Sequence, residues 1–391
     1  PIQYRVPLWR RLAKESCLDF RVLFGSDFSA RGYLDREFGA RFSWDVPLLE
    51  GYDHTVLPGS GKMEGVSFFR PAPGPVFQAV RRARPDVLVC SAYLGAFWMG
   101  ARLASDLTGA GVVFRHEASD EAHRSGFLRK IGRRMLLAWM YHGGTQFACT
   151  GQPAFRHLQA RGIDSSRMHF SPYCVDTEAV EAQRQRWLPR RRELRAGWGV
   201  GEKDRVLIFA GKLIPKKDPL LIARALALLP EKKLNRISWV VAGDGALQQA
   251  VRETSSKILG SRFHFLGFCN QSRLGEVYAA ADLLVLPSLP GAGETWGLVV
   301  NEALQWGIPA AVSDGVGCRH DLIAPGQTGW IFPAGDARAL AGILASWVEM
   351  SSTAEASMQT ACRARAAGFS LEKSAQGLLQ AIGRAARPRQ S

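Results

Sequence analysis

The sequence lacks any apolar run that could cross a bilayer, because the longest, 87–101, has about 15 residues and stops at Arg102. Its seven cysteines are scattered, odd in number and without a C-x-x-C pair, which excludes a disulfide framework or a cysteine zinc site. Neither zinc-finger spacing nor an RNP-like aromatic string is present, so nucleic acid is not an expected partner. No signal-peptide pattern is visible. We therefore expect a cytoplasmic protein.

Acidic residues are fewer than basic ones: the chain has 35 Asp and Glu and 50 Lys and Arg, which gives a net charge of +15. Most of this excess lies in the N-terminal half. A basic surface suits an anionic partner such as membrane phospholipid or a phosphorylated substrate. The length of 391 residues exceeds that of one ordinary core, so two domains are expected.

Short apolar, β-rich runs alternate with segments of helical spacing, such as 220–229 and 273–281, along the whole chain. This alternation predicts an α/β fold of two Rossmann-like domains, each with a doubly wound parallel sheet. Ligands of such sheets bind at the carboxyl ends of the strands, so we expect the site in the cleft between the domains. The predicted strands are 21–25, 67–69, 86–90, 111–116, 146–150, 168–171, 205–210, 238–242, 263–266, 283–286 and 309–312.

The domain boundary is predicted at the polar and basic stretch EAQRQRWLPRRRELRAGWGVGEKDR, which has no core of its own. The predicted parts are an N-terminal domain over 1–177, a linker over 178–203 and a C-terminal domain over 204–368. A last helix within 369–391 is expected to pack back toward the N-terminal domain.

A basic loop follows the apolar strand VLIFA, in the sequence GKLIPKKDP. It begins with Gly211 and Lys212, and Lys216 and Lys217 follow. Lysines at the carboxyl edge of a strand suit a phosphate or diphosphate. The simpler interpretation is a solvated charge cluster on a turn. Asp218 is expected to cap the next helix.

A glycine turn, Gly243-Asp244-Gly245, follows the next strand in the sequence VVAGDGAL. Glycine lets a ligand approach the backbone closely. Connections between strands and helices also use such turns routinely. The pattern therefore leaves open whether the turn binds a ligand or only joins two elements.

An apolar helix is predicted in the sequence GETWGLVVNEALQWGIP, with glutamates before and inside it. The amides of Gly297, Leu298 and Val299, with the positive end of the helix dipole, form an anion site that suits a diphosphate. Glu302 leans back toward this end, where a carboxylate could accept hydrogen bonds from a diol. Glu294 would face the other end of the diphosphate. The alternative is that Glu302 only pairs with a basic side chain.

In this combination the sequence resembles the retaining glycosyltransferases of family four, which have the two-domain GT-B fold. The resemblance rests on the E-x7-E pair Glu294 and Glu302, on GKLIPKKDP, VVAGDGAL and FLGFCNQSRLGEVYAAADLLVLPS, and more loosely on PIQYRVPLWRRLA, WDVPLLEGY and FSPYCVDTEAV. It covers the C-terminal half densely. It implies an N-terminal domain that binds the acceptor, and a further strand and glycine-rich loop upstream of Pro1.

The resemblance implies roles at the matching positions. Lys217 would bind the diphosphate together with Lys212, which stands where the family usually has arginine and lacks that residue's bidentate fork. Glu302 would bind the ribose of the nucleotide, and Glu294 would contact the transferred sugar. His116 would lie near the donor sugar, although a lone histidine is more often structural. No D-x-D occurs in the chain, so we expect no bound metal and no cofactor beyond the donor substrate.

The expected activity is transfer of a hexose-type sugar from a nucleoside diphosphate sugar to a hydroxyl of a glycan or glycolipid, with the anomeric configuration kept. The resemblance suggests bacterial cell-surface polysaccharide, lipopolysaccharide or glycolipid synthesis. One alternative is a nucleotide-sugar epimerase on the same fold, which needs acid–base carboxylates that the N-terminal half does not reveal. Another is a non-catalytic sugar- or lipid-binding protein, against which the intact glutamate pair counts.

The segment 123–142 predicts an amphipathic helix with a cationic face. Arg129, Lys130, Arg133 and Arg134 fall on one side of it, and the apolar residues at 127, 128, 131 and 135 fall largely on another. Such a helix could rest on anionic lipid at the inner face of the cytoplasmic membrane. The simpler interpretation is a surface helix whose arginines are only solvated.

Overall fold

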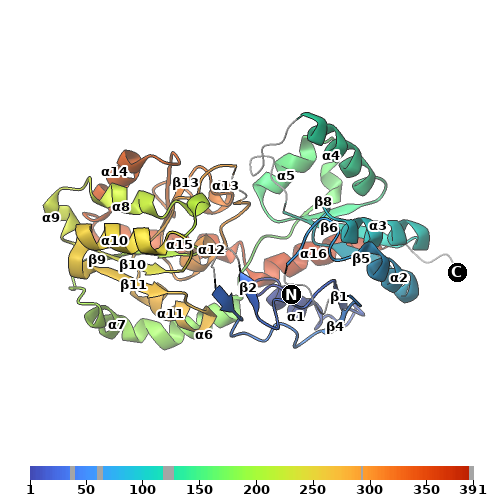
Figure 1. Cartoon of the computed structure of the whole chain (residues 1–391), viewed down its shortest axis with the longest axis horizontal. Coiled ribbons are helices and arrows are strands. Elements are labelled where there is room, and N and C mark those ends of the chain that lie inside the picture. The colour runs from blue at the N-terminus through green and yellow to red at the C-terminus, as the bar shows by residue number, and fades with distance from the viewer. Residues whose placement is uncertain (36–39, 60–64, 118–126, 292–293, 387–391) are drawn as a thin grey trace. The chain divides into compact units, whose positions relative to one another are not determined.

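The chain folds into two compact units, and the computed structural model describes residues 1–35, 40–59, 65–117, 127–291 and 294–386 (Figure 1). The first unit comprises Pro1–Tyr33, Phe42–Tyr173 and Ser370–Ser391, and the second comprises Leu34–Arg41 and Cys174–Phe369. Each unit contains a parallel sheet, so the predicted α/β class is confirmed.

The first unit is built on a parallel sheet in the order β5-β6-β7-β8. Successive strand residues point to opposite faces. Val113 therefore packs with α1 and α16, whereas Val112 and Phe114 pack with α4 and α5. The elements are α1 (Val6–Leu12), β5 (Val87–Cys90), β6 (Gly111–His116), α4 (Phe127–Met140), β7 (Gln146–Cys149), α5 (Gln152–Gln159), β8 (Met168–Phe170) and α16 (Leu371–Ala385).

The strand predicted at 67–69 does not form. Ser67 and Arg70 instead close a turn through two backbone hydrogen bonds of 2.9 and 3.2 Å. Pro71 follows at once, and proline has no amide hydrogen with which to extend a ladder. The remaining elements of this unit are β1 (Arg21–Phe24), β4 (Asp53–Val56), α2 (Pro73–Ala83) and α3 (Ala96–Thr108). A separate two-stranded sheet of β2 (Tyr33–Asp35) and β3 (Ala40–Phe42) falls mostly in the segment Leu34–Arg41, which is grouped with the second unit.

The second unit contains a parallel sheet in the order β11-β10-β9-β12-β13-β14. The chain runs outward from β9 in one direction and, after a crossover, outward from β12 in the other, which is the doubly wound arrangement. The direction reverses between β9 and β12. The strands are β9 (Arg205–Ala210), β10 (Ile237–Ala242), β11 (Phe263–Gly267), β12 (Leu283–Leu286), β13 (Ala310–Ser313) and β14 (Gly329–Phe332).

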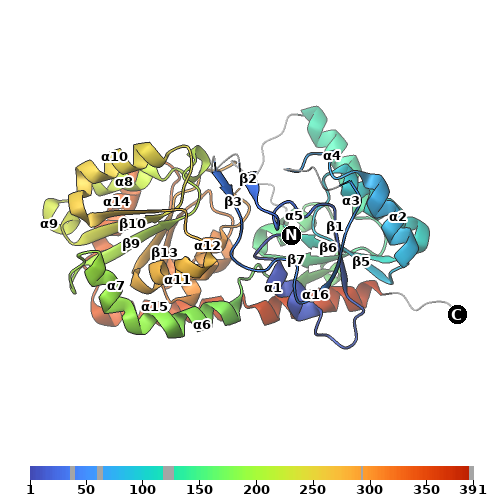
Figure 2. The ribbon, with the colours of Figure 1, turned by 60° about the horizontal axis from the view of Figure 1, so that its bottom comes forward.

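Helices cover both faces of this sheet: α8, α10 and α14 lie on one face, and α11, α12 and α15 on the other (Figure 2). Every residue of β10, β12 and β13 is therefore buried. In the described ranges, no helix of either unit has both the length and the apolar content to span a membrane. The helices are α8 (Leu220–Leu226), α9 (Glu231–Leu234), α10 (Gln248–Leu259), α11 (Gln271–Ala280), α12 (Leu298–Gln305), α13 (Arg319–Leu322), α14 (Ala337–Trp347) and α15 (Ser352–Ala367).

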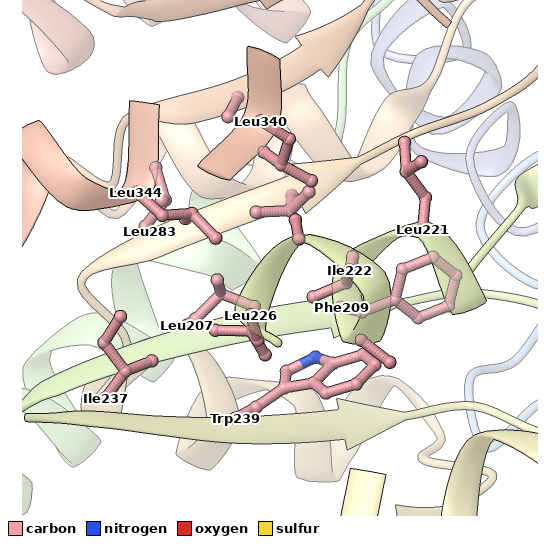
Figure 3. Close-up of a cluster of buried hydrophobic side chains, with 14 of the residues drawn as sticks. Leu207, Phe209, Leu221, Ile222, Leu226, Ile237, Trp239, Leu283, Leu340 and Leu344 are labelled. Carbon is pink, nitrogen blue, oxygen red and sulfur yellow. The ribbon is translucent and has the colours of Figure 1, made fainter. Parts of the chain in front are cut away.

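The main core of the second unit lies between the sheet and α8 (Figure 3). Leu207 and Phe209 of β9 and Trp239 of β10 share one apolar cluster with Leu221 and Ile222 of α8, and all five side chains are 0% exposed. Burial of each such side chain contributes roughly 1.5–3 kcal/mol. This core therefore fixes the strands and the helix that border the functional site.

Residues 178–203, predicted as a linker, are largely helical and belong to the second unit. Their helices, α6 (Thr177–Trp187) and α7 (Arg191–Gly197), pack against α11. Asp282 anchors α7, because it pairs with Arg191 and Arg195 and accepts a hydrogen bond of 2.7 Å from the Val206 amide. Two of the arginines that suggested a solvated linker, Arg191 and Arg195, are thus bound to a carboxylate at the amino end of the sheet.

Replacing Asp282 by asparagine is expected to destabilise the second unit by about 3 kcal/mol, because two guanidinium groups lose their compensating charge. The side chain of Asp282 is only 10% exposed and that of Arg195 13%. Urea unfolding followed by circular dichroism measures the change. Glu202→Gln is the control, since its 3.9 Å pair with Arg192 is 85% exposed on the glutamate side and should matter by less than about 0.5 kcal/mol. Equal effects of the two changes would contradict this account.

Candidate functional site

The polar residues predicted to bind a ligand converge at the switch point of the second unit's sheet. The loop after β9 carries Gly211, Lys212 and Lys217, and the loop after β12 leads through Glu294 to α12. β9 and β12 are parallel neighbours, so both loops start at the same carboxyl edge. A backbone hydrogen bond of 2.8 Å from Leu289 to Lys216 joins them. Ligands of doubly wound sheets bind at this edge.

The glycine turn after β10 packs directly on the loop after β9. A Cβ at Gly243 would overlap the carbonyl oxygen of Gly211, and one at Gly245 would lie 2.6 Å from that of Leu213. The Leu213 amide also donates a hydrogen bond of 2.8 Å to the carbonyl of Asp244. Loop packing therefore accounts for both glycines, and a ligand contact of the turn stays a prediction.

Asp218 does not cap α8 as predicted. Pro219 is the N-cap residue and makes no side-chain cap. Asp218 has φ 41° and ψ 51°, the left-handed region, at the end of a short 3-10 turn, Pro215–Lys217. Its carboxylate instead accepts hydrogen bonds of 3.1 Å from Arg224. The carboxylate of Asp218 is therefore paired with a guanidinium group and not with the first amides of the helix.

Lys217 and Glu294 form an ion pair between the two loops. Their side chains are only 16% and 14% exposed. The Ser288 hydroxyl donates a hydrogen bond of 3.2 Å to the same carboxylate oxygen of Glu294. The lysine predicted to bind a diphosphate is therefore already neutralised by the first glutamate of the E-x7-E pair.

Gly297 begins α12 in a conformation that other residues adopt with strain, at φ 108° and ψ 64°. A Cβ there would also lie 3.0 Å from Leu286 and 3.1 Å from Val316. Among the residues that the structure describes, no side chain caps the helix. The amides of Leu298 and Val299 are in the first turn and have no acceptor within the helix. These first-turn amides are the groups that bind anions at other helix N-termini, and binding of a diphosphate here stays a prediction.

Glu302 lies in the second turn of α12 and accepts a hydrogen bond of 2.6 Å from the Tyr278 hydroxyl. Burial raises the pKa of its carboxyl above the ordinary 4.5, and the hydrogen bond from Tyr278 lowers it. The alternative that Glu302 pairs with a basic side chain finds no support in the part of the chain that the structure describes. Its remaining acceptor capacity is open to a ligand.

Three residues of the site were not predicted from the sequence. Tyr278 holds Glu302, and Ser288 holds Glu294. Cys318 is 0% exposed, and its thiol contacts the carbonyl oxygen of Gly297 at 3.8 Å. Burial raises the pKa of Cys318 well above its ordinary value, so the thiol stays neutral. The serine and tyrosine stand in a sequence quoted for the resemblance; the partner of the tyrosine lies on another helix, and the partner of the serine lies further along the same loop.

His116 ends β6 in the first unit, opposite Cys149 of β7, so its predicted place at a strand's carboxyl end is found. The next residue, Glu117, accepts a hydrogen bond of 2.6 Å from Arg5. Burial raises the pKa of the neighbouring Tyr173 well above its ordinary value, and Glu117 adds to the increase. A role of His116 toward a sugar stays a prediction.

The second unit thus places cations, free helix amides and two carboxylates at one sheet edge. Comparison with known proteins shows what the chain is similar to. Residues 190–366 match the family described as glycosyl transferases group 1. The D-inositol 3-phosphate glycosyltransferase of Rhodococcus jostii is 32% identical over 262 residues, 64% of this chain and 54% of that protein. Its counterpart in Nocardia farcinica is 29% identical over 264 residues, with the same coverage.

The fold is shared with solved structures of glycosyltransferases. Anabaena Alr3699/HepE, in complex with UDP and glucose, has a TM-score of 0.70 at 18% identity over 97% of this chain and 95% of that one. WaaG, a glycosyltransferase involved in lipopolysaccharide biosynthesis, has a TM-score of 0.60 at 17% identity over 95% and 94%. The fold is therefore that of the GT-B glycosyltransferases.

The match to the glycosyl transferases group 1 family lies in the second unit and covers residues 190–366. The chain spans about half the length of the curated relatives that it matches.

Proposed function

We propose that this protein is a retaining glycosyltransferase that moves a hexose-type sugar from a nucleoside diphosphate sugar to a hydroxyl of a glycan or glycolipid. The observation that supports it best is the grouping of Lys217, Glu294 and Glu302 at the switch point of one sheet. Bacterial cell-surface glycan synthesis is the proposed setting. UDP-glucose is the first donor to test, because UDP and glucose occupy the structure of Alr3699/HepE.

In the proposed reaction the acceptor oxygen attacks the anomeric carbon from the face that the diphosphate leaves. The bond to the diphosphate breaks, the new glycosidic bond forms, and a phosphate oxygen takes the proton of the acceptor hydroxyl. Lys212, Lys217 and the amides of α12 stabilise the charge that develops on the leaving diphosphate. Glu302 binds the ribose, and Glu294 binds hydroxyls of the sugar. His116 is proposed to act near that sugar.

Incubation with radiolabelled nucleotide sugars and analysis of the products separates the three candidate functions. A glycosyltransferase releases the nucleoside diphosphate and labels an acceptor. An epimerase changes the sugar but keeps it linked to the nucleotide, and a binding protein leaves the donor intact. Donor that stays unchanged, across UDP-, ADP- and GDP-sugars and a panel of glycan and lipid acceptors, would overturn the proposal.

Turnover is expected to survive an excess of EDTA. The chain contains no D-x-D sequence, and lysines with helix amides already supply positive charge at the proposed diphosphate site. The measurement is product formation with and without EDTA, after prior dialysis against the chelator. Loss of turnover that Mg²⁺ or Mn²⁺ restores would show that a metal ion holds the diphosphate instead.

We also propose that the first unit docks on anionic membrane through α4, the described part of the segment 123–142; residues 123–126 lie outside the described residues. Leu137 and Met140 face the core, so this side of the helix is not available to lipid. Arg134 is exposed, and Met135 is 71% exposed. Arg133, predicted on the cationic face, instead donates a hydrogen bond of 2.7 Å to the Tyr93 hydroxyl. Each cation at an anionic surface adds roughly 1 kcal/mol of attraction.

Sedimentation with lipid vesicles tests this docking. Binding should rise with the fraction of anionic lipid, fall with salt, and decrease several-fold when Arg129, Lys130 and Arg134 are changed to serine. Equal binding to neutral and anionic vesicles, or no binding, would leave α4 as an ordinary surface helix. The charge-matched control changes three exposed cations elsewhere in the first unit, Lys14, Arg21 and Arg82, to serine.

A further inference from the structure

Tyr278 is buried next to the proposed donor site and has no assigned role there. Its side chain is 3% exposed, and its hydroxyl donates the 2.6 Å hydrogen bond to Glu302. Its ring stacks on Trp306, with centroids 6.1 Å apart and an interplanar angle of 23°. Trp306 stands one helical turn beyond Glu302, and its amide donates to the Glu302 carbonyl at 3.2 Å. The three residues form a closed set of contacts between α11 and α12.

We propose that Tyr278 is a positioning residue for the ribose of the nucleoside diphosphate donor, acting through the carboxylate of Glu302. This inference rests on the proposed function. Tyr278 occupies one carboxylate oxygen, which leaves Oε1 and the remaining lone pairs to accept from two adjacent hydroxyls. A carboxylate fixed at one oxygen no longer rotates freely. The diol therefore meets its acceptors already oriented, and less freedom is lost on binding.

The Tyr278 hydroxyl also favours the ionised form of Glu302, which is the better acceptor. Burial raises the pKa of Glu302, and the hydrogen bond from Tyr278 lowers it. Burial and the nearby carboxylate raise the pKa of Tyr278 well above its ordinary 10.0, so the hydroxyl keeps its proton and donates. Across the described ranges, Tyr278 is the one titratable side chain that acts on Glu302.

The test compares binding of UDP and 2′-deoxy-UDP to the whole chain by calorimetry, with ADP and GDP and their deoxy forms where these bind more tightly. Tyr278→Phe keeps the ring and its stack and removes the hydroxyl. It should bind UDP about tenfold more weakly, as expected for one hydrogen bond to a charged group. Its preference for UDP over 2′-deoxy-UDP should shrink by a similar factor. The loss of UDP binding on acidification should move to higher pH, because the carboxyl is protonated more readily.

Two further variants serve as controls for the Tyr278→Phe measurement. Glu302→Gln should lose the preference for the ribose hydroxyl. Tyr52→Phe should leave it unchanged, because it removes a buried hydroxyl that donates to the Leu48 carbonyl in the first unit. If the wild type binds no nucleoside diphosphate, the proposed function itself fails. If Glu302→Gln loses the ribose preference and Tyr278→Phe keeps it, only the role of Tyr278 is overturned. Equal weakening of UDP and 2′-deoxy-UDP by Tyr278→Phe would also overturn that role, because it indicates a structural effect alone.

Discussion

Replacing Glu302 by alanine is expected to weaken the binding of nucleoside diphosphate by about 100-fold or more, because the ribose diol loses two charge-assisted hydrogen bonds. The motivation is a carboxylate inside a largely buried helix whose partner, Tyr278, leaves acceptor capacity unused. Calorimetry with UDP measures the change. Glu253→Ala, at an exposed position of α10, is the matched control and should bind as the wild type does. Wild-type affinity in the Glu302 variant would remove this residue from the donor site.

Replacing Glu302 by glutamine should remove the preference for the ribose hydroxyl and yet stabilise the fold at neutral pH. The pKa of Glu302 is raised in the folded chain, so its contribution to folding is most favourable at low pH and is lost as the pH rises through the folded pKa. Glu302→Gln removes that loss and still accepts from Tyr278. It should therefore raise the melting temperature by a few degrees at neutral pH, with no gain below about pH 4.

Glu302→Ala should instead lower the melting temperature, because the buried Tyr278 hydroxyl is left without a partner. Thermal unfolding of both variants at acidic and neutral pH distinguishes these outcomes. If Glu302→Gln were less stable than the wild type at neutral pH, the buried carboxylate of Glu302 would not destabilise the fold as we expect.

Strands buried on both faces were predicted to within about one residue of their bounds, and so were β1 and β8, although each has an exposed residue. Residues 238–242 and 283–286 are continuous apolar runs, which marks them as inner strands of a covered parallel sheet. The strands that were missed have exposed residues: Ile331 of β14 is 39% exposed, and β4 has the burial pattern of three exposed residues and one intermediate. At the edges of a sheet the hydrophobic pattern is interrupted, and the sequence signal weakens with it.

The residues of the candidate site also differ in how far the sequence could predict them. Lys217, Glu294 and Glu302 could be found because their order and spacing along the chain are themselves the signal. The contact of Tyr278 with Glu302 could not, because it joins two helices, and a tyrosine among apolar residues indicates only a core position. The pairing of Asp282 with two arginines of α7 could not be predicted either, because a basic stretch has the composition of a solvated linker. Both contacts join residues far apart in the sequence, and such contacts leave no local pattern.

The ion pair between Lys217 and Glu294 predicts that the two residues affect binding in opposite directions. Lys217→Ala is expected to lower kcat by about 10²–10³-fold, because the leaving diphosphate loses a preorganised cation, and to weaken UDP binding as well. Glu294→Gln frees Lys217 from its partner. It should therefore bind UDP several-fold more tightly than the wild type, since no carboxylate competes with the diphosphate for the lysine.

Turnover of Glu294→Gln should nevertheless fall, because the sugar hydroxyls lose their carboxylate acceptor. Calorimetry with UDP and steady-state rates with the best donor sugar give the two quantities separately. Lys203→Ala, an exposed cation of the same unit, is the control for loss of charge and should alter neither. If Glu294→Gln weakens UDP binding as much as Lys217→Ala does, the carboxylate orients the lysine for the diphosphate and does not compete with it. The ion pair would then be part of the assembled site, and donor binding would not need to break it.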